Sequence, residues 1–145
     1  MVRESPVPRY TSILTAGPWR QFAYWRYIRV SATVIDTVDE LAAMMPCASD
    51  NIFRFVCTTS SSSGDMLIDE GPTKCDSSMP QQPRPLWWNI PYSHGTSFII
   101  SDGNIADHYS LDYISDTVLR LSQGETYDPM RGDVESHVLV YRRLH

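Results

Sequence analysis

The sequence predicts an all-β fold, arranged as an antiparallel β-sandwich, and three features support this prediction. Stretches with alternating apolar and polar residues recur along the chain, as expected of half-buried strands. Aromatic residues, which favour strands, make up 11% of the sequence. A helical pattern occurs in one short segment, and a length of 145 residues suits a single domain spanning 1–145.

The first 20 residues are expected to form an irregular arm. Pro6, Pro8 and Pro18 interrupt this segment, so that at most one helical turn is expected in it. Residues 22–35 then predict a long strand, because one of its faces is nearly all apolar while the other becomes polar toward its end.

A short helix is expected after this strand. Thr37 and Glu40 match a capping box, in which Thr37 is the N-cap residue. Val38 and Leu41 fall on one helical face, and Pro46 ends the pattern.

The middle of the chain predicts a buried strand followed by a long loop. Residues 52–58 are mostly apolar and β-branched or aromatic. Residues 59–85 have few side chains to bury and no clear period, so they predict a long exposed loop with a short strand at 66–68.

The remaining strands of the sandwich are expected in the second half. The segments are 86–92, 98–100, 113–121 and 136–144, separated by turn residues such as Asp102-Gly103 and Asp128-Pro129. Pro91 cannot donate to a strand ladder, so the first of these segments is expected at a sheet edge or a strand end.

Composition excludes several classes of protein. The net charge of −5 argues against strong nucleic-acid binding. No apolar run is long enough for a transmembrane helix, so no membrane partner is expected. Cys47, Cys57 and Cys75 are odd in number and match no metal-binding spacing, which favours reduced, partly buried thiols.

Catalytic chemistry has little support. Ser93 or Ser97 with His94 offers the parts of a nucleophilic triad, but no nucleophile elbow surrounds either serine. The histidines lack metal-ligand spacing, and the glycines form no phosphate-binding loop. We therefore predict no catalytic residues, no metal site and no cofactor, and interpret the chain as a non-enzyme.

Two groups of residues are candidates for contacts with partners. Trp25, Trp87, Trp88 and Tyr92 are large aromatic side chains suited to subunit interfaces, and Trp87 with Tyr92 could also stack on sugar rings. Arg131, Gly132 and Asp133 form an integrin-recognition tripeptide within an expected turn, which predicts a receptor-binding site.

Three patches resemble capsid proteins of picorna-like insect viruses, the dicistroviruses and iflaviruses. Arg9-Tyr10-Thr11 with the strand at 22–30 resembles their arginine–aromatic stretch, although Tyr27 stands where the family usually has glycine. Residues 88–93 resemble their Pro-Tyr segment, and residues 138–143 resemble their final strand.

The resemblance implies an incomplete jelly roll that serves as a structural subunit of an icosahedral shell. It also implies other capsid subunits as partners, a host receptor as a further partner, and a location in the virion after assembly in the host cytoplasm. Two alternatives stay open. One is a glycan- or receptor-binding sandwich that uses Trp87 and Tyr92 or the tripeptide; the other is a small serine hydrolase.

Overall fold

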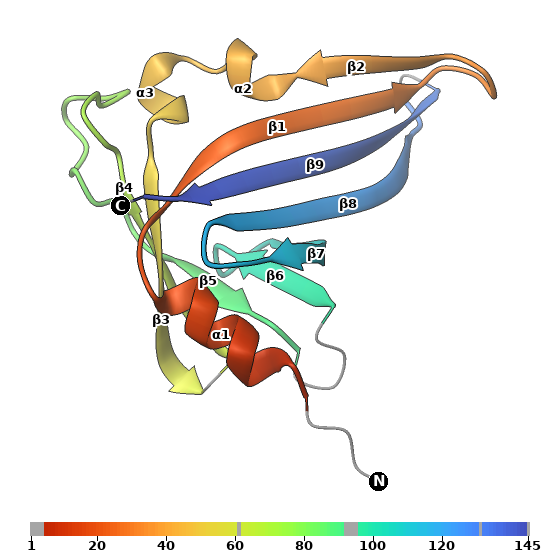
Figure 1. The fold of residues 1–145 in the computed structure, drawn as a ribbon. Helices are drawn as coiled ribbons and strands as arrows, with labels where there is room; N and C mark the ends of the chain where they lie inside the picture. Colours follow the sequence, from red (N-terminus) through yellow and green to blue (C-terminus); the bar gives the residue numbers. More distant parts are fainter. Residues whose placement is uncertain (1–4, 61, 92–95, 131, 145) are drawn as a thin grey trace, which may run out of the picture.

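The computed structural model describes residues 5–60, 62–91, 96–130 and 132–144, which form three helices and nine strands (Figure 1). The helices are α1 (Val7–Thr15), α2 (Glu40–Ala43) and α3 (Pro46–Ser49). The strands are β1 (Trp19–Arg29), β2 (Ile35–Asp39), β3 (Ile52–Ser60), β4 (Ser63–Asp69), β5 (Leu86–Asn89), β6 (Ser97–Ser101), β7 (Ala106–Ile114), β8 (Val118–Asp128) and β9 (Asp133–Arg143). Within these residues, every helix is too short or too polar to cross a bilayer.

All nine strands belong to one antiparallel sheet, which closes on itself. From β3 to β9, each strand pairs with the next one along the chain. β1 completes the circle, because it pairs with β9 along its whole length and with β3 through Trp19 and Arg20. The result is an eight-stranded barrel, with β2 as an additional strand beside the second half of β1.

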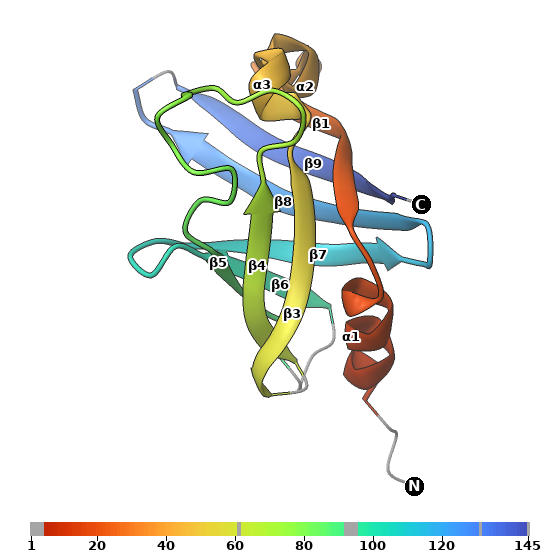
Figure 2. The same ribbon diagram turned by 90° about the vertical axis from the view of Figure 1, so that its left-hand side faces the viewer.

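The prediction of a jelly-roll sandwich is therefore wrong, although the all-β, antiparallel class is confirmed. An inward-facing and an outward-facing residue alternate along each strand in both architectures, so alternation does not distinguish them. What decides is the pairing of β1 with β9, which joins segments more than one hundred residues apart in sequence, such as Arg26 and Glu135. Figure 2 shows the flattened form of this barrel, in which β3 and β4 cross in front of β7, β8 and β9.

The barrel interior is packed with aromatic and aliphatic side chains. Trp88 and Phe98 stack with ring centroids 6.3 Å apart, and Phe55 meets both rings edge-on. The side chains that are almost fully buried are Val7, Leu14, Trp19, Trp88, Ile90, Phe98, Leu119 and Leu121. Offset and edge-on ring contacts of this kind add to the stability that area burial provides.

α1 closes one end of the barrel (Figure 2). Val7, Thr11 and Leu14 lie on one face of the helix and are buried. The helix contacts both β3 and β7, which are not neighbours in the sheet, so it spans the barrel from wall to wall. This helix replaces most of the irregular arm expected at 1–20, because Pro8 falls in the first turn, where a missing N–H costs nothing.

Trp19 joins the start of β1 to the end of α1. The indole Nε1 donates a hydrogen bond to the carbonyl of Leu14 at 2.9 Å, which satisfies a carbonyl at the helix end. Arg143, near the end of β9, places its guanidinium 4.0 Å from the centre of the Trp19 ring and donates to the carbonyls of Ile13 and Gly17. These contacts fix the helix against the barrel.

The strand expected at 22–35 is in fact a hairpin. β1 ends at Arg29, and the chain reverses through Val30–Val34, where the amide of Val30 donates to the carbonyl of Val34 at 3.1 Å. The expected helix also starts later than its capping box suggests. β2 continues through Thr37, and Asp39 caps α2 by accepting a hydrogen bond from the amide of Ala42 at 3.0 Å.

The segment expected to be a long exposed loop, 59–85, is more ordered than its composition suggests. It contains the end of β3 and the whole of β4, which form a hairpin. A disulfide between Cys47 and Cys75 ties the remaining loop to α3, and the amide of Thr73 donates to the carboxylate of Asp50 at 3.1 Å. The expectation of reduced cysteines is therefore wrong for this pair, whereas Cys57 is a free, exposed thiol.

β5, β6 and β9 lie close to the segments predicted at 86–92, 98–100 and 136–144, but most of β7 was not predicted. The segment expected as a single strand, 113–121, contains the turn between β7 and β8. The hydroxyl of Ser115 accepts hydrogen bonds from the amides of Thr117 and Val118, at 3.3 Å and 3.1 Å. This side chain therefore builds a tight turn in the middle of a pattern that is otherwise compatible with a strand.

Candidate functional site

The two ends of the barrel differ in chemistry. α1 and apolar side chains fill one end, whereas polar side chains face the interior at the other. Directly paired residues share a face of a sheet. Tyr24 is paired with buried Leu139, so Tyr24 faces inward, and so does Arg26, which is paired with His137. The same reasoning completes a group that we call the polar end, consisting of Tyr24, Arg26, Asp107, Tyr109, Gln123, Glu135 and His137.

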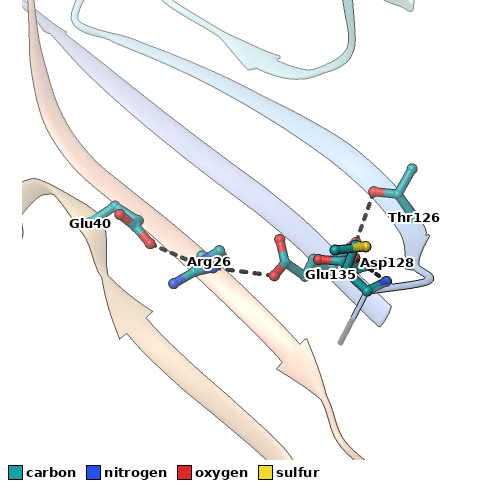
Figure 3. Close-up of polar contacts among 6 residues, drawn as sticks. Arg26, Glu40, Thr126, Asp128 and Glu135 are labelled. Atoms are coloured by element: carbon teal, nitrogen blue, oxygen red, sulfur yellow. Dashed lines mark hydrogen bonds and ion pairs between the residues drawn. The ribbon is translucent and has the colours of Figure 1, made fainter. Parts of the chain in front are cut away.

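Arg26 is the centre of an ion-pair network at the polar end (Figure 3). Its Nε lies 2.7 Å from Oε1 of Glu40, and its Nη1 lies 3.2 Å from Oε1 of Glu135. The three side chains are only 18–26% exposed. Glu40 begins α2, so the network connects α2 with β1 and β9, and partial burial leaves its charges less screened by salt than those of an exposed pair.

His137 and Tyr24 form the aromatic part of the polar end. Their ring centroids are 5.9 Å apart, with an angle of 33° between the planes. Nδ1 of His137 is buried and has no hydrogen-bond partner among the residues that the structure describes. Buried polar atoms are nearly always partnered, so this nitrogen is a position at which a water or a ligand atom would be stabilised.

Two tyrosines of the polar end have raised pKa values. Burial raises the pKa of Tyr109 to about 12, and Asp107 and Tyr24 contribute to the increase. Burial also raises the pKa of Tyr24, and the carboxylates of Glu40, Asp107 and Glu135 raise it further against the opposing effect of Arg26. Both phenols therefore remain protonated hydrogen-bond donors near neutral pH.

A hollow of about 220 Å³ adjoins the polar end. Its lining combines aliphatic and acidic side chains, namely Leu86, Ile100, Ser101, Asp102, Ile105 and Asp107. Asp107 belongs both to this hollow and to the polar end, so the two are continuous. Ile105 is 68% exposed and forms the rim. The carboxylate of Asp102 accepts hydrogen bonds from the amides of Asn104 and Ile105, each 2.8 Å long, which shapes the loop before β7.

Two larger hollows lie on the outer surface of the barrel. One, of about 430 Å³, lies between β1 and α2 and is lined by Phe22, Ala23, Trp25, Asp39, Leu41, Ala42 and Ser49. The other, of about 450 Å³, is lined by Asp112, Tyr113, Val118, Arg120 and Val140. Its arginine and aspartate form a long ion pair of 4.0 Å. Neither hollow contains the polar side chains that the barrel directs inward.

Three carboxylates meet at the turn between β8 and β9. Ligand atoms of Asp128, Asp133 and Glu135 lie within 4.8 Å of one another, and oxygen donors of this kind suit Ca²⁺ or Mg²⁺. Glu135 is already paired with Arg26, and Asp128 accepts a hydrogen bond from the amide of Met130 at 2.8 Å (Figure 3). The group is thus held largely by protein contacts.

The aromatic residues proposed from the sequence fall in different environments. Trp25 faces outward and lines the hollow beside α2, and Trp87 is 39% exposed on the outer face of β5. Trp88 is fully buried, and its Nε1 donates to the carbonyl of Val56 at 3.1 Å, so it forms no part of the surface. Tyr92 lies outside the described residues.

The other predicted sites are described only in part. Ser93 and His94 lie outside the described residues, whereas Ser97 begins β6. Of the integrin-type tripeptide, Arg131 lies outside the described residues. Gly132 has a φ of 72° in the turn between β8 and β9, and Asp133 begins β9. Gly132 and Asp133 therefore lie where the chain passes from the turn into β9, and a receptor-binding role for the tripeptide stays a prediction.

Sequence reasoning missed the polar end. Its residues come from β1, β7, β8 and β9, and only the closure of the barrel brings them together. One signal was present: Arg26 stands on the face of the predicted strand that is otherwise apolar. A charged residue on a core-facing side is a recognised indicator of a buried network or a site.

No family model matches the sequence, and no curated protein is significantly similar to it.

Proposed function

We propose that this protein binds a small organic ligand at the polar end of its barrel. One observation carries the proposal: inward-facing polar side chains, most of them partly buried and one with an unpartnered nitrogen, lie beside a hollow lined by aliphatic and acidic side chains, at the end that α1 leaves uncovered. Binding sites typically combine an apolar lining with a few convergent polar groups in this way.

The barrel dimensions limit the size of the ligand. Eight strands enclose a space that is either filled by side chains or holds one small molecule. Here the fully buried side chains of Trp19, Trp88 and Phe98 fill part of the interior, and Trp19 lies against α1. The ligand would therefore occupy only the polar end of the interior and the adjoining hollow, next to His137 and Tyr24.

A binding role needs no reacting group, which agrees with the prediction that the chain is not an enzyme. The disulfide supports a site of action in an oxidising compartment, because structural disulfides are rare where glutathione keeps thiols reduced. Assembly in the host cytoplasm, implied by the capsid resemblance, remains an untested prediction.

The capsid role itself also remains a prediction. It was tied to a jelly roll, and the observed barrel removes that support. A ligand-binding barrel belongs instead to the second class considered from the sequence, a binding module, with the site moved from Trp87 and Tyr92 to the barrel interior.

Fluorescence titration with the neutral apolar dye phenylnaphthylamine tests the proposal. We expect enhanced emission that saturates near one dye per chain. Ile100→Lys places a charge in the hollow and should abolish the increase, whereas Ile99→Lys lies on the outer face of the same strand and should leave it unchanged. Ile105→Ser, at the exposed rim, should weaken binding without disturbing the fold. Absence of saturable binding, or equal binding by both lysine variants, would reject the proposal.

A further inference from the structure

Carboxylates outnumber cationic groups around the polar end and its hollow. Glu40, Asp107 and Glu135 surround Tyr24, and Arg26 is the cation among them. Arg26 is already engaged by both glutamates. Asp107, in contrast, forms no ion pair or side-chain hydrogen bond with the described residues, and its side chain is exposed in the hollow.

The hollow shows the same excess of carboxylates over cationic groups. Its second carboxylate, Asp102, is held by two backbone amides, and Arg84 is the cation close enough to lower its pKa further after those hydrogen bonds. Even with Arg84 counted, the four carboxylates exceed the two guanidinium groups. An excess of one sign in a concave site raises the local concentration of ligands of the other sign.

The tyrosine rings suit the same kind of ligand. Tyr24 and Tyr109 lie on opposite walls of the barrel interior, on β1 and β7, and both are close to Asp107. The faces of tyrosine rings attract ammonium groups, especially where water is partly excluded. Burial is the main cause of the raised pKa values of these phenols, and the same carboxylates add to the increase.

The remaining contacts are apolar. Leu86, Ile100 and Ile105 supply the apolar part of the lining of the hollow, and they offer a surface for a short hydrocarbon group or a single ring. A ligand that is charged at one end and apolar at the other would satisfy both halves of the site.

We propose that the ligand is a small organic cation. Its ammonium group contacts Asp107 beside Tyr24 and Tyr109, and its short apolar group packs against Leu86, Ile100 and Ile105. This inference rests on the proposed function, because it names the ligand class of the same site.

Three phenethyl compounds of similar size but different charge separate the two proposals. Calorimetric titration would compare phenethylammonium, phenethyl alcohol and phenylacetate at low salt. We expect the cation to bind at least tenfold more tightly than the alcohol, and the anion to bind most weakly. High salt should reduce the preference, because it screens a partly exposed charge.

A matched pair of variants tests whether the preference for the cation depends on the carboxylate of Asp107. Asp107→Asn removes the carboxylate at constant shape and should weaken binding of the cation about tenfold, while binding of the alcohol stays the same. Asp112→Asn makes the same change on the same strand but in the outer hollow, and should leave both affinities unchanged.

The outcomes distinguish the two proposals. If the three compounds bind equally, or if the dye binds and none of them does, the charge inference is wrong and the ligand-binding function stands. If neither the dye nor any of the three compounds binds, the proposed function fails, and the inference falls with it. An equal loss of cation binding in both variants would also overturn the inference.

Discussion

Loss of the Cys47–Cys75 disulfide should destabilise the barrel substantially. The bond joins residues 28 apart in sequence, and the chain-entropy relation for a loop of this length gives about 3.6 kcal/mol at 25 °C. The native loop keeps other contacts without the disulfide, among them the hydrogen bond from Thr73 to Asp50. The folded state should therefore persist, and most of the effect should arise from greater freedom of the unfolded chain.

Urea denaturation of three proteins measures this effect. Cys57→Ser removes the free thiol and should stay within about 0.5 kcal/mol of the natural sequence, since Cys57 is exposed. Adding Cys75→Ser removes the disulfide at its exposed end and leaves buried Cys47 as a thiol, a state that protein cores tolerate. The double variant should lose about 3 kcal/mol and show a larger m-value, because its unfolded chain is more expanded. A loss below about 1 kcal/mol with an unchanged m-value would refute the entropic reasoning.

Three further predictions concern the core, a turn and the alkaline range. Trp19→Phe should cost about 2–4 kcal/mol in urea denaturation, because it removes a fully buried indole and its hydrogen bond to α1. Gly71→Ala should cost more than Gly103→Ala in the same measurement. Both glycines have positive φ, which costs an alanine about 1 kcal/mol, but only at Gly71 would the Cβ meet a backbone oxygen, that of Asp50, at 2.4 Å. The raised pKa of Tyr109 should make stability fall at alkaline pH. The phenol of Tyr109 has a pKa of 10.0 in the unfolded chain and of about 12 in the folded protein. Its contribution to the free energy of unfolding is therefore complete below pH 10.0 and is lost as the pH rises to about 12. Tyr109→Phe should make this fall shallower in denaturation midpoints measured across that range; an unaltered slope would contradict the assignment.

Strands were predictable from sequence where one alternating segment corresponds to one strand. β6 and β9 lie where alternation and the turns at Asp102-Gly103 and Asp128-Pro129 place them. The predictions failed where a turn is made of residues that also suit strands. Val30–Val34 contains β-branched residues, and Ser115 builds its turn with a side-chain hydroxyl, so neither reversal interrupts the pattern clearly.

The closure of the barrel and the polar end could not be predicted from the sequence, for a different reason. A barrel and a sandwich need the same alternation, and the difference lies in whether β1 meets β9. The polar end depends on the same pairing, which places Arg26 opposite His137. The cysteines illustrate the point again: an odd count suggested thiols, whereas the fold brings Cys47 and Cys75 together and leaves Cys57 apart. Contacts between distant segments are set by register and closure, which a local pattern does not encode.

The pairing of the first barrel strand with the last has a consequence for biosynthesis. β1 leaves the ribosome early, but the strand that covers its long edge emerges about one hundred residues later, as the separation between Arg26 and Glu135 illustrates. Until then, aromatic side chains such as Trp19 and Tyr24 lack their main neighbours. Such non-local topologies fold slowly and expose unpaired strand edges in the meantime. Nascent chains should therefore need chaperone protection until β9 has been synthesised, and premature termination before β9 should yield insoluble products.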